Sequence, residues 1–163
     1  MPYPLQFQRA TELDVRSLGV SGNSKLQQSY ARVLADTEAD AFVFDAFSNP
    51  KAPEIRKLFA DFVKTIRAKH PTTPLIFQQT IYRGGRNFNT ALDRSETEKM
   101  AAAEDVVRKA METDPNIYLI YPVADTDGSS CTDKTHPSDL GYYNWAESIR
   151  QPILEILSRY PAK

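Results

Sequence analysis

The sequence predicts an open three-layer α/β fold, in which helices cover both faces of a parallel sheet. Strand-sized apolar segments alternate with segments of helical periodicity along the chain. One of the apolar segments has no polar face, which is typical of a strand buried inside a parallel sheet. Because this alternation continues through all 163 residues, we expect a single domain, residues 1–163.

Two strands are expected in the first half of the chain. The first covers residues 13–20, after a short helix within residues 5–13, and enters a turn where Asn23 or Ser24 caps the next helix. The second covers residues 40–47 and ends at Ser48-Asn49-Pro50. The helix after Pro53 has the clearest period, with apolar residues at Ile55, Leu58, Phe59, Phe62, Val63 and Ile66.

Two more strands are expected in the second half, over residues 75–80 and 116–121. Between them, the capping-box pattern of Ser95 and Glu98 predicts a helix over residues 95–111. Pro137 suits the first turn of a last helix that extends to residue 159.

The overall composition argues against several classes of partner. Lys and Arg number 20 against 21 acidic residues, so no excess of positive charge attracts nucleic acid or an anionic membrane. No apolar run has the roughly 20 residues that a membrane-spanning helix needs. The N-terminal residues lack the apolar core of a signal peptide, and a lone Cys131 excludes an intrachain disulfide.

Three polar turns are expected at the carboxyl edge of the sheet, where open α/β folds bind their ligands. They are residues 21–24 after the first strand, Ser48-Asn49 after the second, and residues 133–136 before the last helix. Their convergence is a stronger indication of a site than any one of them.

Asp133 and His136 are the candidate acid and base of this site. A carboxylate three residues before a histidine can accept a hydrogen bond from Nδ1, which leaves Nε2 to act as a general base. Gly22 and Asn49 are candidate donors to an oxyanion, through a backbone N–H and a side-chain amide. Each of these residues also has a purely structural interpretation, as a turn or cap. His70, at an expected helix end, is interpreted as a cap.

Two other groups of residues carry weaker predictions. Asp125, Asp127 and Asp133 share one loop, but their spacing does not match a calcium-binding loop, and no metal ligand set is predicted. Arg83 and Arg86 flank a glycine pair and can bind an anionic group, although loop arginines are usually solvated.

The turn at residues 19–24, the segment at 42–50 and the run Asp133-Lys134-Thr135-His136-Pro137 together resemble the SGNH (GDSL-like) hydrolase family. The resemblance implies a flavodoxin-like α/β/α fold and an esterase, lipase or deacetylase that needs no metal or other cofactor. It implies Gly22 and Asn49 as oxyanion donors, Asp133 as the acid and His136 as the base. The implied partner is a small acyl or acetyl ester or an acylated carbohydrate.

The chain departs from the family pattern at the nucleophile. The Gly-Asp-Ser or Gly-Thr-Ser block is absent from the sequence, and the resemblance implies that a central strand, between residues 13–20 and 40–47, is absent with it. We therefore expect an exposed sheet edge, through which the chain can form a homo-oligomer, and very low activity. Ser21, Ser24 and Ser48 are the weak substitutes for the nucleophile. Lys134 stands where the family commonly has glycine.

Two other functions remain open. The chain can be a non-catalytic binding or assembly module that retains the hydrolase fold. A flavodoxin-like nucleotide binder is the weaker alternative, because no expected strand is followed by a glycine-rich phosphate loop.

Overall fold

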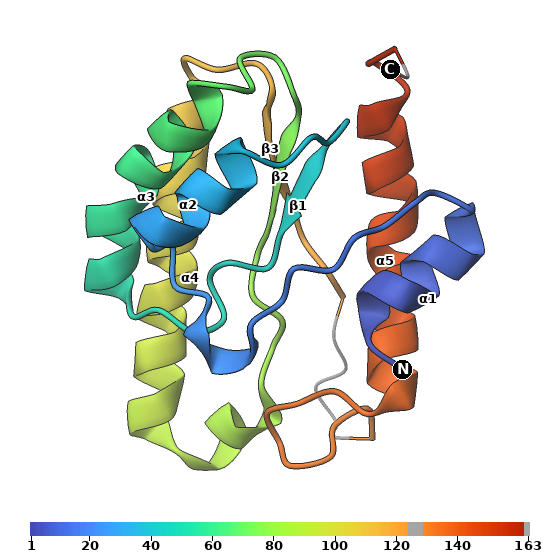
Figure 1. Cartoon of the computed structure of the whole chain (residues 1–163). Helices are drawn as coiled ribbons and strands as arrows, with labels where there is room; N and C mark the ends of the chain where they lie inside the picture. Colours follow the sequence, from blue (N-terminus) through green and yellow to red (C-terminus); the bar gives the residue numbers. More distant parts are fainter. Residues whose placement is uncertain (124–128, 162–163) are drawn as a thin grey trace.

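The computed structural model describes residues 1–123 and 129–161. Its centre is a parallel sheet with the strand order β1-β2-β3 (Figure 1). The strands are β1 (Phe42–Phe44), β2 (Leu75–Gln78) and β3 (Ile117–Ile120). The predicted fold class, an open parallel sheet covered by helices, is confirmed.

Helices form a layer on each face of the sheet (Figure 1). One layer contains α2 (Gln28–Ala35), α3 (Ala52–Arg67) and α4 (Thr90–Met111). The other contains α1 (Tyr3–Thr11) and α5 (Asp139–Leu157), which pack against each other. Two short 3₁₀ helices, η1 (Ser21–Asn23) and η2 (Gly84–Phe88), lie in the connections.

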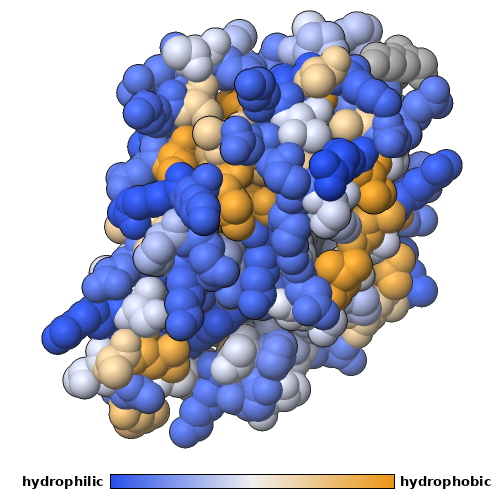
Figure 2. Space-filling view, turned by 60° about the vertical axis from the view of Figure 1, so that its left-hand side comes forward, coloured by the Kyte–Doolittle hydropathy of each residue, from blue (hydrophilic) through white to orange (hydrophobic). Residues whose placement is uncertain are grey.

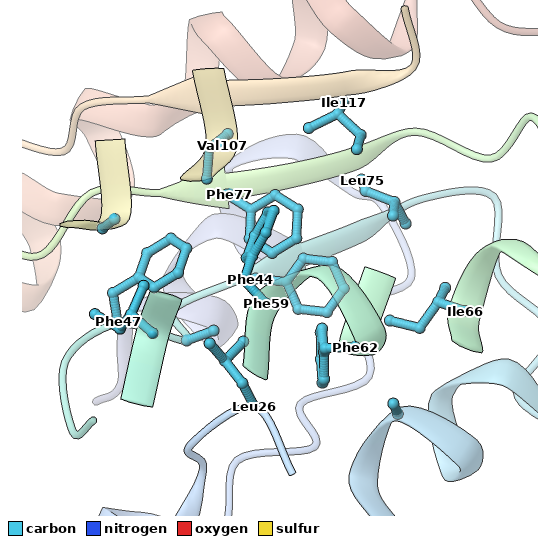
Figure 3. Packing of buried hydrophobic residues seen from close by; sticks show 14 of the residues in the cluster. Leu26, Phe44, Phe47, Phe59, Phe62, Ile66, Leu75, Phe77, Val107 and Ile117 are labelled. Carbon is cyan, nitrogen blue, oxygen red and sulfur yellow. The ribbon is translucent and has the colours of Figure 1, made fainter. Parts of the chain in front are cut away.

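The central strand β2 divides the apolar core into two halves. Leu75 and Phe77 pack toward α2, α3 and α4, whereas Ile76 packs toward α5, as the two-residue period of a strand requires. The first half is rich in aromatic rings: Phe44 and Phe77 stack at 4.6 Å (Figure 3). Full burial of each such side chain stabilises the fold by about 1.5–3 kcal/mol. The outer surface of the layer that contains α2, α3 and α4 is mostly hydrophilic, with separate apolar areas (Figure 2).

The strand expected at residues 13–20 is not formed. These residues have no regular structure until η1 begins, and Leu13, Leu18 and Val20 are exposed. A strand is stable only when its backbone groups pair with a neighbour. Among the described residues, β1 pairs with β2 alone, so residues 13–20 have no adjacent strand to pair with.

Three helix starts also differ from the sequence prediction. Helix α4 begins at Thr90, because the Asn89 side chain accepts a hydrogen bond from Leu92 N at 2.9 Å and acts as the cap. The predicted start at Ser95 therefore lies inside the helix. Helix α2 begins at Gln28, after the expected caps Asn23 and Ser24. Helix α5 begins at Asp139 with Ser138 as its cap, so Pro137 precedes the helix and is not in its first turn. Within the described part of the chain, no helix is both long enough and apolar enough to cross a membrane.

Candidate functional site

The three segments that the sequence analysis singled out all lie at the carboxyl end of the sheet, the lower end in Figure 1. They are η1, the loop that follows β1, and the loop that precedes α5. Four candidate residues in these segments lie close together in two pairs: Asp133 with His136, and Gly22 with Asn49. The structure gives no direct contact between the two pairs.

Asp133 and His136 form the contact that the sequence predicts. His136 Nδ1 lies 2.7 Å from Asp133 Oδ2. The other carboxylate oxygen accepts hydrogen bonds from the backbone N–H of His136 at 2.7 Å and of Thr135 at 2.9 Å. This arrangement fixes the imidazole through Nδ1, so Nε2 is the ring nitrogen available to take up a proton. The His136 side chain is 70% exposed, so the imidazole ring is accessible from solvent.

These hydrogen bonds lower the pKa of Asp133 to about 2. The backbone N–H of His136 is the largest cause, followed by the His136 ring and the backbone N–H of Thr135. Asp133 is thus ionised at neutral pH and can stabilise a protonated imidazole beside it.

The loop that carries this pair is held in place by neighbouring backbone. Thr132 N donates to His136 O at 2.9 Å, and Ser138 N donates to Ser130 O at 2.8 Å. Gly85 N, from η2, donates to Lys134 O at 3.1 Å. Lys134 has a positive φ of 65°, a left-handed conformation that glycine adopts with less strain.

Gly22 and Asn49 lie next to each other. A Cβ atom at Gly22 would be 3.9 Å from Asn49 Oδ1, and both residues are exposed. The amide nitrogen of Asn49 reaches the same space after a half-turn of the side-chain amide. A backbone N–H and an amide N–H beside one exposed space are the donor types that stabilise an oxyanion.

Tyr142, in the first turns of α5, is influenced by carboxylates from two of the segments at the carboxyl end of the sheet. Burial raises the pKa of its phenol, and the negative charges of Asp45 and Asp133 raise it further. Asp45 follows β1, whereas Asp133 belongs to the loop before α5.

The three serines near the site differ in their surroundings. Ser48 Oγ donates to Asp45 Oδ1 at 2.6 Å. Ser21 is exposed and has a positive φ of 56°, and Ser24 is half-buried after η1. His70 Nε2 lies 3.2 Å from Ala35 O, so its ring contacts the end of the neighbouring helix α2 and not the end of α3, the helix that it follows.

The remaining candidates do not form a ligand site in the described residues. Arg83 donates to Ser48 O and pairs with Glu96, and Arg86 pairs with Asp93, so both arginines are engaged within the protein. Asp125 and Asp127 lie outside the described residues. In residues 1–123 and 129–161, no three or more His, Cys, Asp or Glu side chains are grouped to hold a metal ion.

Sequence reasoning missed the polar groups buried beneath the site. Gln78, at the end of β2, is fully buried. Its amide donates to the Tyr3 hydroxyl at 3.0 Å and accepts from the Trp145 indole at 2.7 Å, and Tyr3 stacks on Trp145 at 4.3 Å. This network fastens α1 and α5 to the sheet. The only sequence signal was a glutamine at the end of an otherwise apolar strand.

The sequence model of the GDSL-like lipase/acylhydrolase family matches residues 1–155. The chain belongs to this family. No protein with curated annotation matches the chain significantly.

Two solved structures are similar to this chain in fold. A protein from Bacteroides ovatus, described as a GDSL-like lipase, is 36% identical and superposes with a TM-score of 0.88 over 98% of this chain and 49% of its own. The salicylyl-acyltransferase SsfX3 of a tetracycline biosynthetic pathway is 22% identical, with a TM-score of 0.68 over 94% of this chain and 48% of its own. This second likeness shows the fold alone. The chain spans about half the length of each of these two proteins.

Proposed function

We propose that this chain supplies the acid–base pair and the oxyanion donors of a serine ester hydrolase. The substrate is a small acyl or acetyl ester or an acylated carbohydrate. The observation that carries the proposal is the Asp133–His136 contact, at the same end of the sheet as the adjacent Gly22 and Asn49. Membership of the GDSL-like lipase/acylhydrolase family supports the reaction class.

In this reaction, a serine hydroxyl attacks the ester carbonyl carbon and transfers its proton to His136 Nε2. Asp133 stabilises the imidazolium that forms. The Gly22 N–H and the Asn49 amide donate to the oxygen of the tetrahedral intermediate. His136 then gives its proton to the leaving alcohol, and water hydrolyses the acyl-enzyme by the same steps.

In our proposal, this chain does not supply the serine nucleophile. The sequence has no Gly-Asp-Ser or Gly-Thr-Ser block, and Ser48 is bonded to Asp45. The hydroxyl would come from a strand-forming segment paired to the open edge of β1. That edge also suits association between two copies of the chain.

The hydrolysis of p-nitrophenyl acetate by the purified chain tests the oxyanion role. Sites that lack one triad member retain a residual rate of roughly 10³-fold over water, which comes from the oxyanion donors and substrate binding. We expect Asn49→Ala to lower this residual rate by about 10²-fold. His136→Ala should change it little, because the chain supplies no serine hydroxyl from which His136 would take a proton. His70→Ala is the matched control, because His70 only contacts the end of a helix. Equal rates for wild type and Asn49→Ala would refute the proposal.

A non-catalytic binding module is the second candidate, and the missing nucleophile block favours it. In that case acylated sugars would bind, and Asn49→Ala would weaken their binding, while no variant would change the slow ester hydrolysis. Isothermal titration with an acetylated oligosaccharide separates this function from the first.

A further inference from the structure

A buried cluster of charged side chains lies against the loop that carries Asn49. Glu96 and Lys99, one turn apart on α4, are only 4% and 6% exposed. Lys99 Nζ is 2.6 Å from Glu96 Oε1, and Arg83 Nη1 is 3.4 Å from the same oxygen. Removal of charged groups from water is costly, and a buried ion pair often does not recover that cost. A buried cluster of this kind is therefore weak evidence for a stabilising role alone.

Both cations of the cluster donate to one carbonyl oxygen, that of Ser48. Arg83 Nη2 lies 2.8 Å from Ser48 O, and Lys99 Nζ lies 3.2 Å from it. The Ser48 hydroxyl is bonded in turn to Asp45 at 2.6 Å. The backbone carbonyl of Ser48 is thus fixed by two cations, and its hydroxyl is fixed by the Asp45 carboxyl group.

The peptide group held in this way leads directly into Asn49. Asn49 itself is exposed. Among the described residues, no hydrogen bond from another side chain fixes its amide. The Ser48 carbonyl therefore provides the fixed point from which the Asn49 side chain extends toward Gly22. Oxyanion donors act only from a well-defined position, since a displacement of about 1 Å can cost about 10²-fold in rate.

We propose that Arg83 and Lys99, held by Glu96, are positioning residues for the Asn49 amide. The inference rests on the proposed function, because it gives Asn49 the role of an oxyanion donor. The competing interpretation is a purely structural ion pair that fastens α4 to the loop after β1.

Nuclear magnetic resonance of the ¹⁵N-labelled chain separates the two interpretations. The readout is the pair of side-chain NH₂ signals of Asn49, assigned by their loss in Asn49→Asp. We expect Arg83→Met to shift and broaden these signals, and Arg83→Lys to restore them in part. Arg83→Met leaves the Lys99–Glu96 pair intact, so no buried charge is left unpaired. The double variant Glu96→Gln/Lys99→Met removes the whole buried pair without leaving an isolated charge.

Arg56→Met is the matched control, because it removes an exposed ion pair between α3 and Asp105 of α4. Unchanged Asn49 signals in folded Arg83→Met and in the folded double variant would overturn the inference and leave a structural ion pair. The readout needs no turnover, so it does not depend on the hydrolysis assay. If the Asn49 signals move while Asn49→Ala hydrolyses esters at the wild-type rate, the proposed function fails and the positional effect on Asn49 stands.

Discussion

At the scale of single residues, Asp133 has the clearest electrostatic signature in the site. Its folded pKa of about 2 lies below the unfolded value of roughly 3.9. A lowered carboxyl pKa stabilises the fold above the unfolded value, and this contribution is lost as the pH falls through the folded pKa. We expect the ¹³C signal of the Asp133 carboxyl to titrate with a midpoint near 2. A midpoint at or above the ordinary value would contradict the hydrogen-bonded geometry.

The variant His136→Ala refines this prediction. It removes the ring contact but keeps the backbone N–H at position 136, which is the largest cause of the shift. The pKa of Asp133 should therefore rise only part of the way to its ordinary value. Full recovery of the ordinary value would mean that the imidazole, not the backbone, holds the carboxylate.

Local spacing explains which site residues the sequence could predict. Asp133 and His136 are three residues apart, so one turn of the loop brings them together whatever the rest of the fold does. The convergence of Arg83 and Lys99 on Ser48 O joins three distant segments. In the sequence, these two residues look like ordinary solvated cations. Only the packing of α4 against the loop after β1 makes them neighbours.

At the scale of elements, Gly141 fixes how α5 meets the loop that carries His136. A Cβ at this position would overlap the backbone carbonyl of Ser130 and crowd Pro137. Alanine usually favours a helix over glycine by up to about 1 kcal/mol, but here the clash with backbone should dominate. We expect Gly141→Ala to lower the free energy of unfolding by about 1–3 kcal/mol, measured by urea denaturation.

Gly84→Ala is the control for this prediction, because a Cβ at Gly84 has no atom within 4 Å. Its free energy of unfolding should stay close to that of the wild type. Equal stability of Gly141→Ala and Gly84→Ala would show that α5 and the loop are not as closely packed as the structure has them.

The period of apolar residues predicted the long elements well and their ends less well. Helix α3 and the strands β1, β2 and β3 lie where the apolar pattern placed them. The start of α4 was wrong, because Asn89 offers a cap six residues before Ser95. The strand at residues 13–20 was wrong, because its apolar residues identify a strand only if a partner strand lies beside it.

At the scale of the whole molecule, the outer edge of β1 is the main unsatisfied feature. Among the described residues, no strand pairs with β1 on the side away from β2, and Val43 is 40% exposed there. Such edges favour pairing with another chain. We expect light scattering to show an average mass that rises with protein concentration, and Val43→Lys to reduce this rise. A single monomeric mass at all concentrations would contradict the edge association.

We propose that residues 1–163 provide the base and the oxyanion donors of an ester hydrolase without its nucleophile. The most direct measurement is the intact mass of the chain after incubation with a fluorophosphonate, followed by peptide mapping. We expect no covalent adduct on any serine. A stoichiometric adduct on Ser21, Ser24 or Ser48 that disappears in His136→Ala would contradict it, because the chain would then carry its own activated nucleophile.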